Sequence, residues 1–381
     1  MENDCYNDKR SIIEFEQTDK KGAEKRHAVS GEFVDLDGER YYAIRNVDKL
    51  APFFISIVSD SDHWLFISSN GGLTAGRVSP ETALFPYVTV DKIHDSAIHT
   101  GSKTLFRVNT GGRQYEWEPF NTEHDGLYVI HRHIYKNLLG NKIRFEEINH
   151  DLQLVFRYTW ATSDSYGFIR LCELTSLGDD SISVDMVDGL QNVLPASTPR
   201  IAQTNSSNLV DAYKWTEFDR DSGMGLFTLY SGITDRAEPC ESLKANTVFC
   251  LGLNKHKVLI SSDQLDSFRC GEKLHQEEFK RGVRGAYFAN QTLKLEPHAS
   301  QYWQFVANVE QSQPQVVELR RELEKPDVIA VKIADSVNEG TDKLARIMAS
   351  ADGFQVLSEE NVAVHLNANV LFNVMRGGVF N

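Results

Sequence analysis

The chain has 381 residues, a hydrophobic fraction of 41%, a charged fraction of 25% and a formal net charge of −14. This composition is typical of a globular protein, and the length predicts one large double-sheet domain with an appendage, or two domains. The negative charge disfavours contact with phosphate backbones and anionic lipid, so we expect neither nucleic acid nor a membrane as a partner.

The N-terminus is acidic and polar and lacks the apolar stretch of a signal peptide, and no run of residues is long enough to cross a bilayer. These features predict a cytoplasmic protein. The five cysteines are scattered without metal-ligand spacing, and we expect them to be reduced thiols. They are Cys5, Cys172, Cys240, Cys250 and Cys270.

From residue 31 to residue 309, short β-rich segments alternate with turn residues, as expected for a sandwich and not for βαβ units. The first two segments, 53–58 and 63–67, are joined by the turn residues 59–62, which predicts a hairpin. Polar and apolar residues partly alternate, which indicates half-buried antiparallel strands. We therefore predict a mainly β fold, a large antiparallel sandwich. Its later strands are expected at 104–109, 126–134, 143–148, 152–158, 167–174 and 181–187.

The pattern becomes helical after residue 311. Residues 316–324 have apolar positions at helical spacing, and Pro326 is expected to end this helix. A second helix is predicted to begin at Asp335 or Thr341 and to end near Met348. We thus expect a sandwich domain over residues 1–310 and a helical linker over residues 311–381.

Several short motifs have residue types that could carry chemistry. The glycine-rich segment 69–77 lacks the Gly-Lys-Ser/Thr ending of a phosphate loop and is predicted to be a glycine hairpin or a place of close backbone approach. His131 and His133 share one face of a strand, but no third metal ligand is evident, so surface histidines are the preferred interpretation. The sequence contains neither His-Glu-x-x-His nor Gly-x-Ser-x-Gly. We therefore expect no metal and no cofactor.

Two carboxylate clusters are the candidates for contact with sugar. Glu146 and Asp151 lie between two predicted strands, and Asp235 and Glu238 lie in the acidic segment 235–241. Glycoside chemistry uses a carboxylate pair as acid and base, but acidic turns are also common on the surface of an acidic protein. We expect structural or substrate-orienting roles for these four residues.

The five tryptophans can stack on sugar rings or fill the core of a sandwich. Trp64, Trp160 and Trp303 lie in apolar runs and are predicted to be core residues. Trp117 and Trp215 have polar neighbours and are therefore the candidates for stacking on sugar.

Segments 84–93, 145–152, 188–195 and 235–239, together with the closing segment 369–380, resemble the N-terminal part of bacterial proteins of the cellobiose phosphorylase and oligoglucan phosphorylase group. The resemblance implies an extended β-sandwich of the mutarotase-like kind, followed over residues 311–381 by a helical linker and the start of an (α/α)₆ barrel. The missing remainder of that barrel would carry the general acid and the phosphate-binding residues. It assigns no catalytic residue to this chain.

Two of these segments carry further expectations. The closing segment is apolar, as if another element began there, and its Arg376 is a further candidate for sugar binding. Such a surface also predicts self-association, for instance as a homodimer. In segment 188–195, Gly189 and Pro195 are expected to bracket a loop. Its apolar residues Leu190, Val193 and Leu194 are expected to be buried in the core.

Three functions remain open. The first is a carbohydrate-binding, non-catalytic portion of a glycoside phosphorylase or hydrolase that acts on β-glucan-type oligosaccharides with its barrel in cis. The second is a self-sufficient mutarotase-type enzyme in which Glu146 or Glu238 works with a histidine as an acid–base pair. The third is an interaction or dimerisation module without a ligand.

Overall fold

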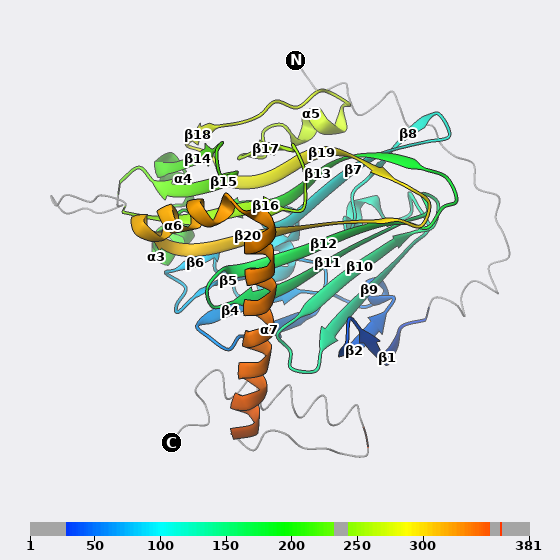
Figure 1. Ribbon diagram of the computed structural model, residues 1–381, viewed down its shortest axis with the longest axis horizontal. Coiled ribbons are helices and arrows are strands. Elements are labelled where there is room, and N and C mark those ends of the chain that lie inside the picture. The colour runs from blue at the N-terminus through cyan, green and yellow to red at the C-terminus, as the bar shows by residue number, and fades with distance from the viewer. Residues whose placement is uncertain (1–27, 232–242, 351–358, 360–381) are drawn as a thin grey trace.

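The structure is a computed structural model that describes residues 28–231, residues 243–350 and Glu359. Within these residues the chain forms three antiparallel sheets, followed by two helices (Figure 1). The predicted fold class, a mainly β sandwich followed by a helical segment, is confirmed. None of the described helices combines the length and the apolar character that crossing a bilayer requires.

The largest sheet has 11 strands in the order β1-β2-β9-β10-β11-β12-β20-β16-β15-β14-β18. We call it the large sheet. Its strands are β1 Ser30–Leu36, β2 Glu39–Arg45, β9 Ile130–Asn137, β10 Ile143–Asn149, β11 Leu154–Ser163, β12 Gly167–Ser176, β14 Lys214–Asp219, β15 Met224–Leu229, β16 Lys244–Leu251, β18 Phe279–Arg281 and β20 Ser300–Ser312.

Two smaller sheets lie on one side of the large sheet. The five-stranded sheet has the order β17-β19-β13-β7-β8, with β7 Gly101–Thr110, β8 Arg113–Trp117, β13 Ile182–Val193, β17 Lys257–Leu259 and β19 Gly285–Leu295. The four-stranded sheet has the order β3-β4-β5-β6, with β3 Phe54–Ile57, β4 His63–Ser68, β5 Leu73–Arg77 and β6 Ala83–Phe85.

The main core lies between the large sheet and the two smaller sheets. One cluster of buried side chains joins all three, for example through Phe156 of the large sheet, Phe106 of the five-stranded sheet and Leu65 of the four-stranded sheet. We call the side of the large sheet that faces this core the inner face and the opposite side the outer face. Because successive side chains of a strand point to opposite faces, β10 to β12 present every second residue to each side.

The two C-terminal helices are α6, Gln313–Leu323, and α7, Pro326–Ser350. A capping box between Ser312 and Gln315 begins α6. The prediction that a second helix begins at Asp335 or Thr341 is wrong, because α7 begins at Pro326. Proline is favoured in the first turn of a helix, where its missing N–H is not needed, so Pro326 ends one helix and also begins the next.

Helix α7 covers part of the outer face of the large sheet (Figure 1). Its buried side chains recur at helical spacing and include Ile329, Ile333 and Val337, which pack against Ile169 and Val306 of the sheet. The shorter helices are α2 Val90–Ile93, α3 Arg200–Asn205, α4 Ser207–Tyr213, α5 Leu265–Arg269, η3 Val47–Lys49, η4 His94–Ile98 and η5 Thr122–His124.

Segment 188–195 is not the predicted loop. Asp188 to Val193 complete strand β13, although Leu190, Val193 and Leu194 are core residues as expected. The cause is a close approach between neighbouring strands. A Cβ atom at Gly189 would lie 1.9 Å from the carbonyl oxygen of Tyr287. Glycine therefore permits strand pairing at this position, and does not mark a turn.

The cysteines differ from the prediction at one described position. Cys172 and Cys250 carry free thiols, but Cys270 is disulfide-bonded. Cys5 and Cys240 lie outside the described residues. The cytoplasmic location stays a prediction.

Candidate functional site: a groove on the outer face

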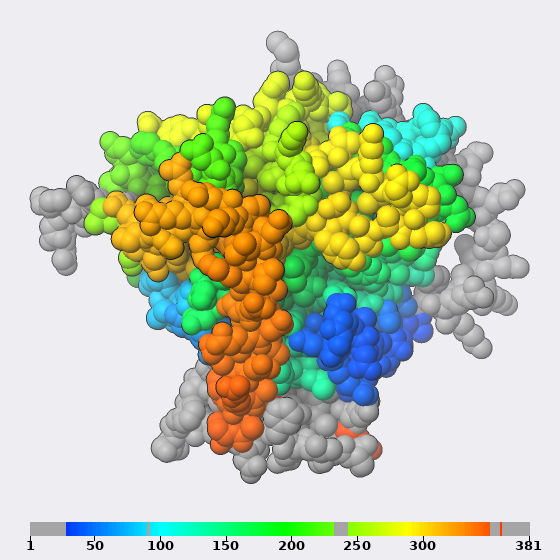
Figure 2. Space-filling view, in the orientation of Figure 1, coloured from blue at the N-terminus to red at the C-terminus, as the bar shows by residue number. Residues whose placement is uncertain are grey.

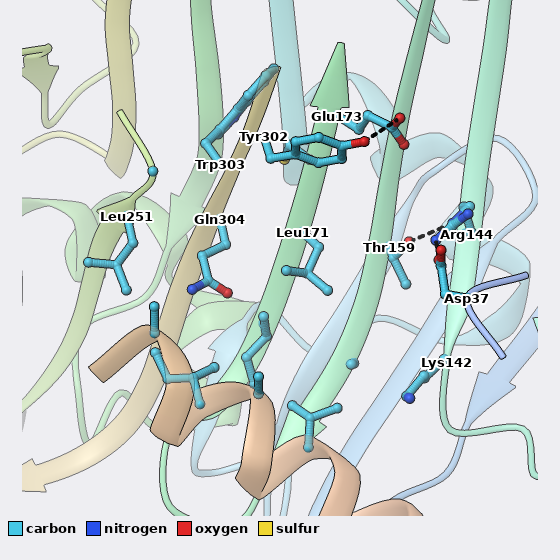
Figure 3. Close-up of a pocket in the computed structure, with 18 of the residues that line it drawn as sticks. Asp37, Lys142, Arg144, Thr159, Leu171, Glu173, Leu251, Tyr302, Trp303 and Gln304 are labelled. Atoms are coloured by element: carbon cyan, nitrogen blue, oxygen red, sulfur yellow. Dashed lines mark hydrogen bonds and ion pairs between the residues drawn. The ribbon is translucent and has the colours of Figure 1, made fainter. Parts of the chain in front are cut away.

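A groove with a volume of about 630 Å³ lies on the outer face of the large sheet. Helix α7 forms one wall, and the tip of the β1–β2 hairpin forms the opposite wall, as the orange ridge and the blue hairpin show in Figure 2. The floor consists of β10, β11, β12 and β20. Figure 3 shows the floor side chains directed into the space between the two walls.

Strand pairing places the floor side chains in parallel rows across the sheet. One row contains Arg144, Thr159, Leu171 and Gln304, each directly opposite the next. The neighbouring row contains Glu146, Arg157, Glu173 and Tyr302, again directly opposite one another. We call this second row the polar belt. Cross-strand neighbours of this kind are close enough to interact, so register alone brings these side chains together.

The polar belt is a continuous series of contacts. Arg157 donates from Nε to an oxygen of Glu146 at 2.5 Å, and its Nη1 lies 3.3 Å from an oxygen of Glu173. The hydroxyl of Tyr302 donates to the same oxygen of Glu173 at 3.2 Å. Tyr135, on β9, donates to the other oxygen of Glu146 at 2.6 Å. The guanidinium of Arg157 is thus held between two carboxylates.

The charges of the belt are stabilised by this arrangement. Burial alone would raise the pKa of Glu146, but the charge of Arg157 and the hydrogen bonds from Tyr135 and Arg157 outweigh it and lower the pKa. Burial would likewise lower the pKa of Arg157, yet the carboxylates of Glu146 and Glu173 raise it. Both groups therefore remain ionised at neutral pH.

The hairpin wall is also attached by ion pairs. Arg144 donates to Asp37 at 2.5 Å, and Lys142 donates to Glu39 at 2.6 Å. Asp37 and Gly38 have φ values of 52° and 82°, the left-handed conformation that a two-residue hairpin turn requires. This turn places both acidic side chains over the edge of the floor.

Apolar surface completes the groove. Leu171 is 45% exposed and Tyr302 is 60% exposed, unusual values for large side chains in the middle of a sheet. Toward α7 the floor becomes fully apolar, with Ala161 and Ile169 beneath the helix. A ring with one apolar face and polar edges would therefore find both kinds of surface within one groove.

The chemistry of the groove favours binding of a neutral, polar molecule over catalysis. Arg144, Lys142 and Arg157 each pair with a carboxylate, so none of them selects strongly for an anion. Glu146 accepts hydrogen bonds from Tyr135 and Arg157 that stabilise its ionised form. Its pKa is lowered, so it is a weak base. It orients Arg157, and this arrangement does not support its predicted role in an acid–base pair.

The predicted sugar-binding residues lie in different places. Glu146 supports the groove from the polar belt. Asp151 lies within the β10–β11 connection, where it accepts a hydrogen bond from the backbone N–H of Val129 at 2.6 Å. Asp235, Glu238 and Arg376 lie outside the described residues.

Trp117 is a core residue and not the stacking surface that its polar neighbours suggested. It is 1% exposed, and its Nε1 donates to Glu147 at 2.7 Å. Glu147 also accepts from Arg132 and from the backbone N–H of Phe120, both at 2.7 Å. Polar neighbours in the sequence therefore do not indicate that Trp117 is exposed, because its N–H has a hydrogen-bond partner in the core. Trp160 and Trp303 are buried as predicted, whereas Trp64 is half-buried.

Trp215 is half-buried at the far edge of the large sheet and does not line the groove. Its ring is stacked on Tyr230, with centroids 5.5 Å apart, and the guanidinium of Arg281 lies 4.0 Å from its centroid. Tyr230 follows β15 and Arg281 belongs to β18, the two neighbours of β14. The indole therefore already packs against side chains from both neighbouring strands.

The histidines also form a defined arrangement. His131 and His133 share the outer face of β9, and a ring nitrogen of His150 lies 2.9 Å from one of His131. His133 accepts a hydrogen bond from the backbone N–H of Asn46 at 3.0 Å. Among the described residues, no group of three or more His, Cys, Asp or Glu side chains could hold a metal ion.

Sequence reasoning did not identify Arg157, Glu173 or Tyr302. Each is one of several polar residues in its strand, and the alternating pattern attributes it to an ordinary solvent-facing position. The pairing of β11 with β12 and of β12 with β20 shows that they are neighbours, and β20 lies more than 120 residues further along the chain.

The fold is shared with part of a bacterial glucoamylase solved in complex with acarbose. The two chains are 8% identical with a TM-score of 0.50, and the match covers 84% of this chain and 39% of the glucoamylase. A polysaccharide lyase matches with 12% identity and a TM-score of 0.35, covering 72% of this chain and 34% of the lyase. A galactose mutarotase-like protein from Clostridium acetobutylicum matches with 10% identity and a TM-score of 0.33, covering 74% and 98% of the respective chains.

The likeness to the glucoamylase shows the fold alone. The chain spans about two fifths of the length of the glucoamylase. No protein-family model and no curated protein matches the sequence. The sandwich that the resemblance to glycoside phosphorylases implies is therefore present, and a particular relation to cellobiose phosphorylase stays a prediction.

Proposed function

We propose that this chain is the carbohydrate-binding sandwich of a larger sugar-active enzyme of the glycoside phosphorylase or hydrolase kind, and that the groove binds part of an oligosaccharide of the β-glucan type. The observation that carries the proposal is the combination of Tyr302 and Leu171, both exposed, with paired charges beside them. Aromatic and apolar faces pack on sugar rings, while fixed polar groups hydrogen-bond to hydroxyls.

Two further observations support this function. The groove has about the volume expected of a ligand-binding pocket, a few hundred to a thousand Å³. The structure that shares the fold is a glucoamylase solved with acarbose, and this chain corresponds to 39% of it. In this proposal the catalytic acid and any phosphate-binding residues belong to a barrel in cis, beyond the sandwich.

The test is a titration of the chain with cello-oligosaccharides and laminari-oligosaccharides, followed by calorimetry. Tyr302→Ala removes the exposed ring and is expected to weaken binding about tenfold, which corresponds to about 1.4 kcal/mol. Tyr302→Phe keeps the ring and is expected to retain most of the affinity. Tyr230→Ala removes a similarly exposed tyrosine at the far edge of the sheet and is the matched control.

Equal losses in Tyr302→Ala and Tyr230→Ala would show that the groove is not the sugar site. A chain that binds no glycan but forms a stable dimer in light scattering would instead favour an interaction module. Turnover of free sugar anomers by this chain alone would favour the mutarotase-type enzyme.

A further inference from the structure

A second, smaller cavity lies at one end of the sandwich and shares no lining residue with the groove. Its volume is about 220 Å³. It lies among the turn between β4 and β5, helix η4, the start of β7, the segment that follows β8, and β11. The inner face of the large sheet thus contributes to this cavity, whereas the outer face forms the groove.

The side chain of Tyr158 points into the cavity from β11. It is 3% exposed, and its ring lies between Phe145, with centroids 4.9 Å apart, and the guanidinium of Arg170, 4.8 Å from its centroid. The hydroxyl has no hydrogen-bond partner among the described residues. Gly71 borders it closely, since a Cβ atom there would lie 3.4 Å from the hydroxyl oxygen.

Ser102 supplies a second unpartnered hydroxyl in the same cavity. Its Oγ is buried and has no hydrogen-bond partner within the described part of the chain. A buried polar group without a partner costs about 1–3 kcal/mol. This cost falls on the Ser102 Oγ, and it indicates that a polar molecule in the cavity completes the hydrogen bonds of Ser102, beside the hydroxyl of Tyr158.

The buried charged groups of the cavity are engaged with other side chains, while the carboxylate of Asp95 lies at its exposed border. Lys103 forms an ion pair with Glu118, and Glu118 also accepts from Arg269 at 3.2 Å. His94 shares a hydrogen bond of 2.6 Å with Ser68. Because its buried carboxylate and ammonium neutralise each other, the cavity has little preference for an ion over a neutral molecule.

We infer that this cavity is a binding site for one neutral sugar ring, or for a polyol of that size, separate from the oligosaccharide groove. The volume corresponds to roughly seven waters, which suits one ring and not a chain of several. The hydroxyls of Tyr158 and Ser102 can each donate and accept, which matches the hydroxyls of a sugar.

The test is a titration of isotope-labelled protein with D-glucose, D-galactose or D-mannose, observed through the amide signals of Gly71 and Lys103. At least one hexose is expected to shift both signals. Tyr158→Phe is expected to weaken that binding about tenfold without lowering Tm, because the hydroxyl it removes is unpartnered. Ser102→Ala is also expected to weaken hexose binding.

Tyr287→Phe is the matched control, since the hydroxyl of Tyr287 donates to the backbone carbonyl of Gly223 at 2.6 Å. This variant is expected to lower Tm and leave hexose binding intact. The inference is overturned if no hexose shifts these signals at millimolar concentration, if inorganic phosphate shifts them instead, or if Tyr158→Phe binds as tightly as the unchanged protein. Tyr302→Ala is expected to leave this binding unaffected, which separates the cavity from the groove.

Discussion

The inner and outer faces of β10, β11 and β12 both carry ion pairs, but the two sets of ion pairs differ in their exposure to solvent. On the inner face, Arg170 donates to both oxygens of Asp188 at 2.9 Å and 3.0 Å, and neither side chain is exposed. Thr104 and Trp303 each add a hydrogen bond of 2.6 Å to Asp188. On the outer face, Arg157 and Glu173 retain contact with solvent and with the groove.

The inner pair, Arg170 with Asp188, has no oxygen free for a ligand, whereas the outer pair, Arg157 with Glu173, borders the groove. The carboxylate of Asp188 is fully occupied by side chains of two sheets, so no oxygen remains for a ligand. Glu173 is shared between Arg157 and Tyr302, both of which line the groove. Breaking a fully buried pair leaves an uncompensated buried charge and costs several kcal/mol, whereas breaking a half-exposed pair costs about 1 kcal/mol or less.

The largest expected effect is on the inner face. Asp188→Asn leaves the buried guanidinium of Arg170 without its counter-charge and is expected to lower the free energy of unfolding by about 3–5 kcal/mol. Urea unfolding followed by tryptophan fluorescence measures this loss. Glu173→Gln is the matched carboxylate on the outer face and is expected to cost less than about 1 kcal/mol. Equal losses would remove the distinction between the faces.

The next effect concerns the part of the outer face beneath α7. Ile333→Ala removes a buried side chain that packs on the sheet and is expected to cost about 2–5 kcal/mol. Val331→Ala, on the exposed side of the same helix, is expected to change stability by less than about 0.5 kcal/mol. Thermal unfolding of the two variants compares them. If both were neutral, α7 would not stabilise the sandwich.

A smaller effect is expected at the polar belt and depends on pH. Because the pKa of Glu146 is lower in the folded chain than its ordinary value of 4.5, its stabilisation is complete at neutral pH and is lost as the pH falls through the folded-state pKa. Glu146→Gln is expected to cost about 1.5–3 kcal/mol at pH 7.

The comparison is made by urea unfolding between pH 7 and about 3. The difference between Glu146→Gln and the unchanged chain is expected to shrink toward the acidic end, because the carboxyl group gains protons as the pH falls below 4.5 toward its lowered folded-state pKa. A difference that stays constant with pH would show that the charge of Glu146 does not stabilise the belt.

The smallest effect is expected at the hairpin wall. Asp37→Asn breaks an ion pair whose carboxylate is 78% exposed, and the expected cost is about 0.2–1 kcal/mol at low salt. Salt screens such a pair, so the difference from the unchanged chain is expected to vanish near 1 M NaCl. A loss that persists in high salt would mean that Asp37 acts by a route other than its charge.

Much of the sandwich is determined by local sequence. The predicted hairpin at residues 59–62 joins β3 to β4, and the later predicted strands overlap β7 and β9 to β13. These predictions hold because alternation and turn chemistry act over neighbouring residues. The core positions of Trp160 and Trp303 follow from the same apolar runs.

Which side chains contact one another across the sheets was decided by tertiary structure. Trp117 has polar neighbours in the sequence, yet it is buried, because Glu147, 30 residues away, accepts a hydrogen bond from its N–H. Pro326 was expected only to end a helix, but it also begins α7. The contacts that α7 buries against the outer face stabilise this helix, and they cannot be read from local helix propensity. The groove arises from strand register, which sets Arg157, Glu173 and Tyr302 side by side. Register depends on which strands meet, and a single strand's residue pattern does not contain that information.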